Sequence, residues 1–162
     1  MSSMIRKSKI IFFCVTLLII ISLISCKKSK YDVIPDVYVD FYLSLSDPEF
    51  FVLTGATNSM VITSTTNNFG SSAAGYNNNG IIVYRSALED QFYAYDRTCP
   101  YDYAVNGLSI KINTAFMSAL CPKCSTSYSL EAGGTPISGI VRYPLKNYKT
   151  GFDGQTVHVW HH

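Results

Sequence analysis

YDRTCPYD at residues 95–102 and CPKC at residues 121–124 form the most informative pattern of this 162-residue chain. Each stretch has a proline directly after its first cysteine, and these two cysteines, Cys99 and Cys121, are 22 positions apart (121 minus 99). Thiolates are soft metal ligands, and neighbouring thiols in an oxidising compartment pair into disulfides. The two loops therefore predict either a metal site or a cross-link between them.

The order of the ligand positions resembles the two cluster-binding loops of the Rieske iron–sulfur proteins. In that family two cysteines hold one iron and two histidines hold the other. Cys99 and Cys121 stand at the cysteine positions, whereas Tyr101 and Cys124 stand where the family has histidine. The chain is thus similar to a Rieske domain whose ligand set has changed.

The resemblance covers most of residues 31–162 and implies an all-β fold, an antiparallel β-sandwich or small barrel with a two-loop subdomain. The residue pattern favours the same class, because short β-branched and aromatic runs alternate with turns rich in Gly, Asn and Pro. One helical turn is expected after Asp47, and residues 64–80 are expected to form a loop. The expected strands are residues 37–43, 60–63, 81–84, 91–95, 108–112, 142–145 and 156–160.

The resemblance leaves three states open for the altered site, because a phenol with a pKa of about 10 is a poor substitute for imidazole. In the first, Cys99, Cys121 and Cys124 hold a 2Fe–2S cluster with Asp102 or Tyr101. In the second, the same three cysteines hold zinc with Asp102 or water. The third state has no cofactor and a disulfide from Cys99 to Cys121 or Cys124, and the sequence favours it because exported thiols oxidise.

The first 25 residues have the pattern of a bacterial lipoprotein signal peptide. Three basic residues precede an apolar run of roughly 15 positions, which is shorter than the about 20 residues of a membrane-spanning helix. Ser25 directly before Cys26 resembles the lipobox, so we expect cleavage before Cys26 and acylation of its thiol. Residues 26–36 then form a lipidated tether and residues 37–162 the Rieske-like domain.

Charge separates the leader and tether from the folded part. Six of the 13 Lys and Arg lie in the first 30 residues, whereas all 11 Asp and Glu follow residue 31, so the folded part has a net charge of −4 (7 basic against 11 acidic). This balance argues against nucleic-acid binding. The tether lacks the acidic run of some surface-exported lipoproteins, which favours a lipid-anchored, periplasm-facing position at the outer membrane.

The sequence therefore predicts a binding module. We expect an accessory subunit of an outer-membrane protein complex, for example a type 9 secretion translocon. The alternative is an electron-transfer protein with a modified 2Fe–2S cluster or a Cys-ligated zinc site. No catalytic residue is identified, since no nucleophile motif is present. His158, His161 and His162 fall in or after the last expected strand and are expected to be surface residues and not ligands.

Overall fold

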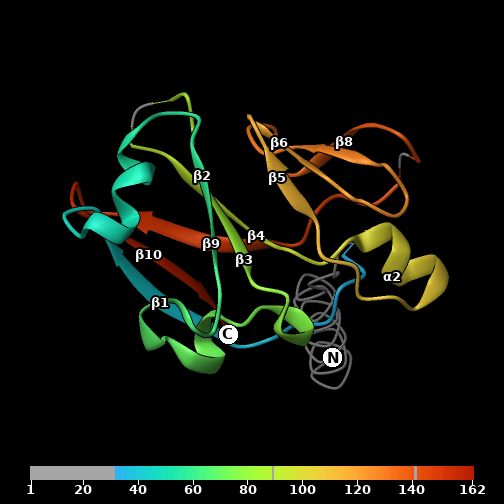
Figure 1. Cartoon of the computed structure of the whole chain (residues 1–162), viewed down its shortest axis with the longest axis horizontal. Helices are drawn as coiled ribbons and strands as arrows, with labels where there is room; N and C mark the ends of the chain where they lie inside the picture. Colours follow the sequence, from blue (N-terminus) through green and yellow to red (C-terminus); the bar gives the residue numbers. More distant parts are fainter. Residues whose placement is uncertain (1–31, 89, 141) are drawn as a thin grey trace, which may run out of the picture.

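The computed structural model describes residues 32–88, 90–140 and 142–162, which form two antiparallel sheets (Figure 1). The larger sheet has the strand order β1-β10-β9-β4-β3-β2. Its strands are β1 (Val39–Ser44), β2 (Ser59–Ile62), β3 (Ile81–Arg85), β4 (Phe92–Asp96), β9 (Asn147–Phe152) and β10 (Thr156–His161). The smaller sheet, in the order β5-β6-β7-β8, consists of β5 (Asn113–Ala115), β6 (Ser118–Leu120), β7 (Ser127–Ser129) and β8 (Thr135–Ser138). The predicted all-β antiparallel class is confirmed.

The smaller sheet is inserted between two neighbouring strands of the larger one. The chain leaves at the end of β4, forms helix α2 (Pro100–Asn106) and strands β5 to β8, and returns as β9. β9 pairs with β4, so that Ala94 lies opposite Tyr148. Figure 1 shows α2 and the smaller sheet on one side of the molecule. We call residues 97–146 the inserted subdomain, and it is the two-loop subdomain that the sequence predicts.

Two hydrophobic cores share the strands of the larger sheet. On β3, Ile81 and Val83 face one core, and Ile82 and Tyr84 face the other. A strand that is buried on both faces has no polar side, which explains the continuous apolar run that begins at Ile81. The second core includes Cys99 and Cys121 together with side chains of the smaller sheet. The cysteine loops therefore lie at the junction of the two sheets.

Two expected strands are absent. Residues 108–112 do not form a strand but lie beside the first cysteine loop, where the amide of Cys99 donates to the carbonyl of Ile110. An isolated bridge between Thr98 and Lys111 is the only ladder contact of this stretch that the structure describes. Residues 142–145 also lack strand structure, and Pro144 within them has no N–H to donate to a ladder. The other expected strands are present, with ends shifted by at most two residues.

Helix α2 was not expected from the sequence. Pro100 occupies its first turn, where a missing N–H does no harm, and Gly107 ends it in the left-handed region with φ of 66°. The expected turn after Asp47 is present as the 3-10 helix η1 (Pro48–Thr54), with the Asp47 side chain accepting from the amide of Glu49. The expected loop at residues 64–80 contains three short 3-10 helices: η2 (Thr66–Asn68), η3 (Gly70–Ala73) and η4 (Tyr76–Asn78).

The predicted leader and lipidation site, residues 1–26, lie outside the described residues. Among the helices of residues 32–162 that the structure describes, none is long and apolar enough to cross a membrane. At the start of the described chain, Asp32 and Asp36 both contact the ammonium group of Lys146, at 3.1 and 2.6 Å. Because Lys146 is buried, this pair fixes the end of the tether onto the domain.

Candidate functional site

The first cysteine loop is positioned by the buried carboxylate of Asp96 at the end of β4. This carboxylate accepts hydrogen bonds from the amide of Thr98 (2.8 Å), the amide of Tyr76 (2.6 Å) and the hydroxyl of Tyr148 (2.6 Å). All three donors come from different parts of the chain, so the direction in which the chain leaves β4 is fixed. Cys99 follows as the residue before α2, and its side chain is buried.

Asp102 lies in the first turn of α2, three residues after Cys99. Its side chain is only 1% exposed, and its Oδ1 accepts from the side-chain amide of Asn106 at 3.2 Å. Its Oδ2 accepts from the thiol of Cys121 at 3.1 Å. In the part of the chain that the structure describes, Asp102 has no ion pair with Lys, Arg or His. It is therefore a buried carboxylate whose protein partners are all uncharged.

The second cysteine loop forms a tight turn between β6 and β7. The amide of Ser125 donates to the carbonyl of Cys121 at 3.0 Å, and Ser125 itself has a positive φ of 57°. This turn brings the side chain of Cys124 to the same side as that of Cys121. The Cys124 sulfur contacts the Cys99 sulfur at 3.6 Å and the Thr126 hydroxyl at 3.3 Å.

The two loops bring four candidate ligands together. One donor atom each from Cys99, Asp102, Cys121 and Cys124 lie within 4.8 Å of one another. The first three residues are buried and Cys124 is half-buried. The sequence offered Asp102 or Tyr101 as the fourth ligand, and the structure selects Asp102. Tyr101 packs on the second core as a partly buried side chain and is not in the group.

Burial dominates the electrostatics of the thiols. It raises the pKa of Cys121 to about 11, although amide hydrogen bonds from Lys123 and Cys124 oppose the shift. Burial likewise raises the pKa of Cys99. Burial by itself raises the pKa of Asp102, but hydrogen bonds from the three thiols and Asn106 outweigh it and lower the pKa below its usual value. Burial therefore disfavours the thiolate forms of Cys99 and Cys121, whereas hydrogen bonds favour the carboxylate form of Asp102.

No disulfide joins the cysteines of the described residues, and Cys99, Cys121 and Cys124 are free thiols. The 3.6 Å between the Cys99 and Cys124 sulfurs is a contact, since a disulfide bond is about 2.05 Å long. The predicted disulfide thus stays a prediction. If the site oxidises, Cys99 and Cys124 are the pair already in contact, because the Cys121 thiol is directed at Asp102.

Two further side chains at the site were not identified from the sequence. The hydroxyl of Tyr128 on β7 lies 3.6 Å from the Cys99 sulfur, and Thr126 contacts Cys124. Both residues are buried. Their position just after Cys124 was the one indication in the sequence, because polar side chains that follow a ligand loop can contact its sulfurs.

The histidines lie on the larger sheet, apart from the four-residue group. His158 on β10 contacts the carboxylate of Asp40 at 2.8 Å and stacks on Tyr42 with ring centroids 4.1 Å apart. His161 contacts Asp36 at 3.1 Å. These are the surface positions that the sequence predicts for them.

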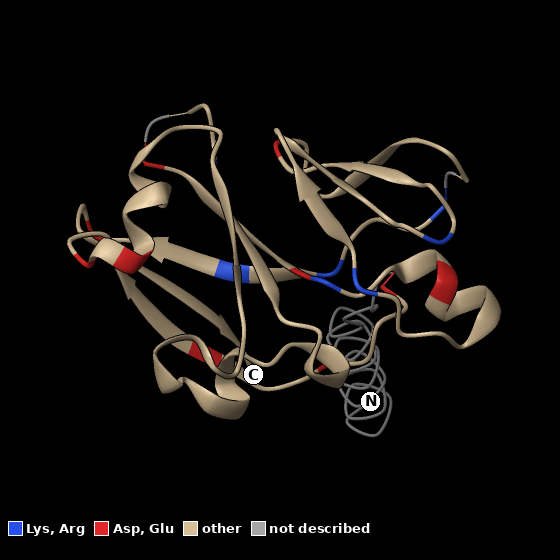
Figure 2. Cartoon of the chain, viewed as in Figure 1, with Lys and Arg blue, Asp and Glu red and all other residues tan. Residues whose placement is uncertain are grey.

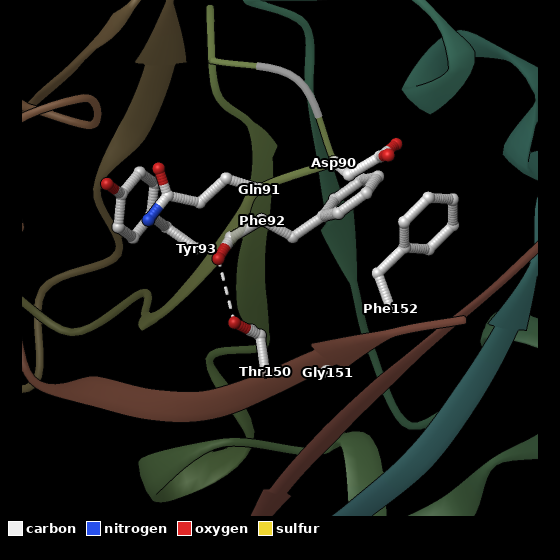
Figure 3. Close-up of a pocket in the computed structure, with 7 residues that line it drawn as sticks. All are labelled: Asp90, Gln91, Phe92, Tyr93, Thr150, Gly151 and Phe152. Carbon is white, nitrogen blue, oxygen red and sulfur yellow. Dashed lines mark hydrogen bonds between the residues drawn. The ribbon is translucent and has the colours of Figure 1, made fainter. Parts of the chain in front are cut away.

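A surface pocket of about 240 Å³ lies elsewhere, between β4 and β9 (Figure 3). Thr150 donates to the carbonyl of Phe92 at 2.7 Å within it. Its lining contains no cysteine or histidine, and its single acidic residue, Asp90, also pairs with Arg85. The chemistry of the molecule is therefore concentrated at the cysteine loops. The pocket is lined by Asp90, Gln91, Phe92, Tyr93, Thr150, Gly151 and Phe152.

Neither a protein-family model nor a curated protein matches the sequence. Solved structures that the chain is similar to include the ferredoxin of carbazole 1,9a-dioxygenase from Nocardioides aromaticivorans, with a TM-score of 0.45 and 13% identity over 76% of this chain and 97% of that one. Another is a cyanobacterial plasma membrane Rieske protein from Synechocystis PCC 6803, with a TM-score of 0.42 and 14% identity over 62% of this chain and 97% of that one. These likenesses concern the fold.

Proposed function

We propose that this chain is a lipid-anchored accessory protein of the cell envelope, which binds a protein partner through its inserted subdomain and carries no 2Fe–2S cluster. The observation that carries the proposal is the set of exposed apolar side chains on that subdomain, together with the absence of charged residues from strands β5 to β8. The altered ligand set supports the proposal that no 2Fe–2S cluster is bound. Acylation of Cys26 and the position at the periplasmic side of the outer membrane are parts of the same proposal.

The residues at the loops do not fit a 2Fe–2S cluster. Such a cluster needs two pairs of donors at the two ends of an Fe₂S₂ unit, so donors on different irons are much further apart than donors on one iron. Here all four donor atoms lie within 4.8 Å of one another, in one compact set. The set also contains no imidazole, and Tyr101 is outside it. This argues against the alternative of an electron-transfer protein.

Exposed apolar side chains are concentrated on the inserted subdomain. Six of the eleven large apolar residues that are exposed in the described chain belong to it. Phe116 at the β5–β6 turn is 76% exposed and Ile137 on β8 is 60% exposed. We call the six residues the apolar set: Val105, Leu108, Phe116, Leu120, Ile137 and Ile140.

The smaller sheet also lacks charge. None of the residues in β5 to β8 is Asp, Glu, Lys or Arg, and Figure 2 shows these strands in tan. Its inner face carries Ala119 and Tyr128, which are buried in the second core, so neighbouring residues such as Leu120 point outward. Protein interfaces are depleted of charge at their centre and enriched in aromatic anchors. The outer face thus has the composition of a protein-binding surface.

The subdomain is held rigidly on the larger sheet. Tyr95 on β4 donates to the carbonyl of Leu130 at 2.6 Å. Glu131 accepts from Tyr84 at 2.8 Å and from Ser86 at 2.6 Å, both from the β3 region. Since ordering a loop on binding weakens affinity, a surface that is already fixed binds more tightly than a mobile one.

The tether would keep this surface near the membrane. Asp32 is six positions after Cys26, and an extended chain of that length reaches about 20 Å. Asp32 is tied to Lys146, so an acylated Cys26 restricts the domain to the bilayer surface, where outer-membrane complexes are within reach. Subunits of a type 9 secretion translocon are the first partners to test.

The experiment compares partner capture by matched surface variants. The full lipoprotein is cross-linked in its own cells and purified in mild detergent, and the recovered envelope proteins are identified and quantified. We expect Phe116→Asp with Ile137→Asp to reduce recovery of a specific outer-membrane protein at least tenfold. Phe51→Asp is the control, because Phe51 is 67% exposed on η1, outside the apolar set. Equal recovery of that outer-membrane protein with the wild type, the double variant and Phe51→Asp would contradict the proposal.

A further inference from the structure

We infer that Cys99, Asp102, Cys121 and Cys124 form a closed, four-coordinate site for one divalent metal ion, of the kind that zinc occupies. In place of the binuclear cluster of the Rieske family, this site would hold one metal ion and would not be empty. This inference is independent of the partner surface, because a metal could bind whether or not the apolar set binds a protein.

The distances are those of donors around a single ion. Zinc–sulfur bonds of about 2.3 Å in a tetrahedral arrangement place two sulfurs about 3.8 Å apart. The Cys99 and Cys124 sulfurs are 3.6 Å apart, and Asp102 Oδ2 is 3.1 Å from the Cys121 sulfur. No pair of donors in the group is separated by more than 4.8 Å. One ion therefore needs only small side-chain adjustments to reach all four donors.

Asp102 supplies a second, independent reason for a cation. A carboxylate that is buried without a positive partner carries a negative charge only at a high cost, because that charge loses hydration and gains no compensating cation. Asp102 is 1% exposed, and no Lys, Arg or His among the described residues pairs with it. A disulfide between two cysteines would leave this charge uncompensated, whereas a divalent ion compensates it directly.

Two hydroxyl groups already lie against the sulfurs. The hydroxyl groups of Thr126 and Tyr128 contact Cys124 and Cys99. Hydrogen bonds of this kind stabilise metal-bound thiolates and set their orientation. They offset the excess negative charge of three thiolates and one carboxylate on one divalent ion.

The ligand set predicts the role and the metal. Three thiolates and one carboxylate fill all four positions of a tetrahedral zinc, which is typical of structural sites; catalytic sites leave one position open to water. On binding, four metal–ligand bonds form and the three thiol protons pass to solvent, with no change of oxidation state. The ion would join α2 to the β6–β7 turn, and so hold the two loops together.

The test is cobalt titration of the full lipoprotein after chelation under reducing conditions. Tetrahedral thiolate-bound Co²⁺ gives intense visible absorption, so the spectrum reports geometry as well as binding. We expect saturation at one ion per chain and displacement of cobalt by one equivalent of zinc. Absence of binding, or saturation at two ions per chain, would overturn the inference.

Matched variants identify the fourth ligand. We expect Asp102→Asn to weaken zinc binding at least 100-fold and to alter the cobalt spectrum. Tyr101→Phe is the control, because Tyr101 directly precedes Asp102 but lies outside the group, and it should leave the affinity and the spectrum unchanged. The reverse result would sink the four-residue set. Because Asp102→Asn could impair folding, X-ray absorption at the zinc edge of the unmodified protein provides the second measurement. Three sulfurs and one oxygen are expected, and four light-atom ligands or a zinc–zinc distance would contradict the site.

Discussion

At the scale of single residues, the chemistry depends on the two positions where the resembling family has histidine, Tyr101 in the first cysteine loop and Cys124 in the second. A Rieske site places a ligand two positions after the first cysteine, and this chain has Tyr101 there. The ligand candidate lies instead at Asp102, because α2 begins at Pro100 and turns the third residue after Cys99 back toward the sulfurs. The neighbouring side chain of Tyr101 packs on the second core. With Asp102 in the first loop and Cys124 in the second, the candidate donors form one compact set.

A prediction at this scale concerns Tyr128. Its hydroxyl lies 3.6 Å from the Cys99 sulfur. A metal-bound thiolate at Cys99 would accept a hydrogen bond from this hydroxyl. We expect Tyr128→Phe to weaken zinc binding by roughly 10- to 100-fold, as removal of a hydrogen bond to a ligand generally does. Competition with a chelator of known affinity measures the change. Tyr95→Phe is the control, since the Tyr95 hydroxyl donates to Leu130 and not to a sulfur; an equal loss in both variants would point to general destabilisation.

At the scale of elements, five of the six strands of the larger sheet were predictable, whereas β9 and the site helix were not. Alternating β-branched and aromatic residues identify β1 and β10, because each has one buried and one exposed face. α2 has only seven residues and no apolar period, so its single sequence signal is Pro100 after Cys99. Residues 108–112 alternate like a strand, yet their hydrogen bonds go to the cysteine loop, which is a tertiary contact that no local pattern encodes.

The candidate site was predictable in its members and not in its geometry. The resemblance to the Rieske loops implied that Cys99, Cys121 and Cys124 are neighbours, and Asp102 was one of two options for the fourth ligand. Selecting Asp102 required the helical turn after Cys99. Thr126 and Tyr128 were missed because their contacts depend on how the β6–β7 turn folds back on α2.

The contact of Glu131 with the β3 region gives a pH prediction for the whole insertion. Burial alone raises the pKa of Glu131, but hydrogen bonds from Ser86, the amide of Ala87 and Tyr84 outweigh it, so the folded-state pKa is lowered. A carboxylate with a lowered pKa stabilises the fold above its unfolded-state pKa of about 4.3, and that stabilisation is lost as the pH falls through the folded value. We expect the free energy of unfolding to decrease over this acidic range.

Glu131→Gln removes this contribution. We expect the variant to be less stable than the wild type at neutral pH and to show a smaller decrease of stability on acidification. Urea unfolding at a series of pH values measures both. Asp153→Asn is a useful comparison, because Asp153 caps the β9–β10 turn and does not contact the inserted subdomain. An identical pH dependence in wild type and Glu131→Gln would show that Glu131 does not hold the two sheets together.

At the scale of the whole molecule, the fold, the tether and the charge act together. Asp32 contacts buried Lys146, so the chain is fixed to the domain six positions after the expected lipidation site. The Lys and Arg positions in Figure 2 are spread over several elements of the described chain and do not line one of them. The described residues thus give no basic stripe of the kind that phosphate backbones require.

The anchor itself is tested through Cys26. We expect the wild-type protein to lose residues 1–25 and to carry acyl chains on Cys26, and Cys26→Ala to accumulate as an unprocessed precursor. Intact mass spectrometry of the membrane fraction distinguishes the two forms. Cys14→Ala is the matched control, since Cys14 lies within the expected leader. Normal processing of Cys26→Ala, or a mature wild-type mass without lipid, would contradict the anchor.

The most direct test of the single-ion site is native mass spectrometry of the wild-type protein, purified from its own membrane without reductant or added metal, with metal analysis of the same sample. We predict a mass that corresponds to the acylated chain plus one zinc minus the protons that the ligands release, with one zinc and no iron or acid-labile sulfide. After denaturation and metal removal, Cys99, Cys121 and Cys124 should all react with a thiol reagent. Two irons with two sulfides, or a metal-free chain with Cys99 joined to Cys121 or Cys124, would contradict it.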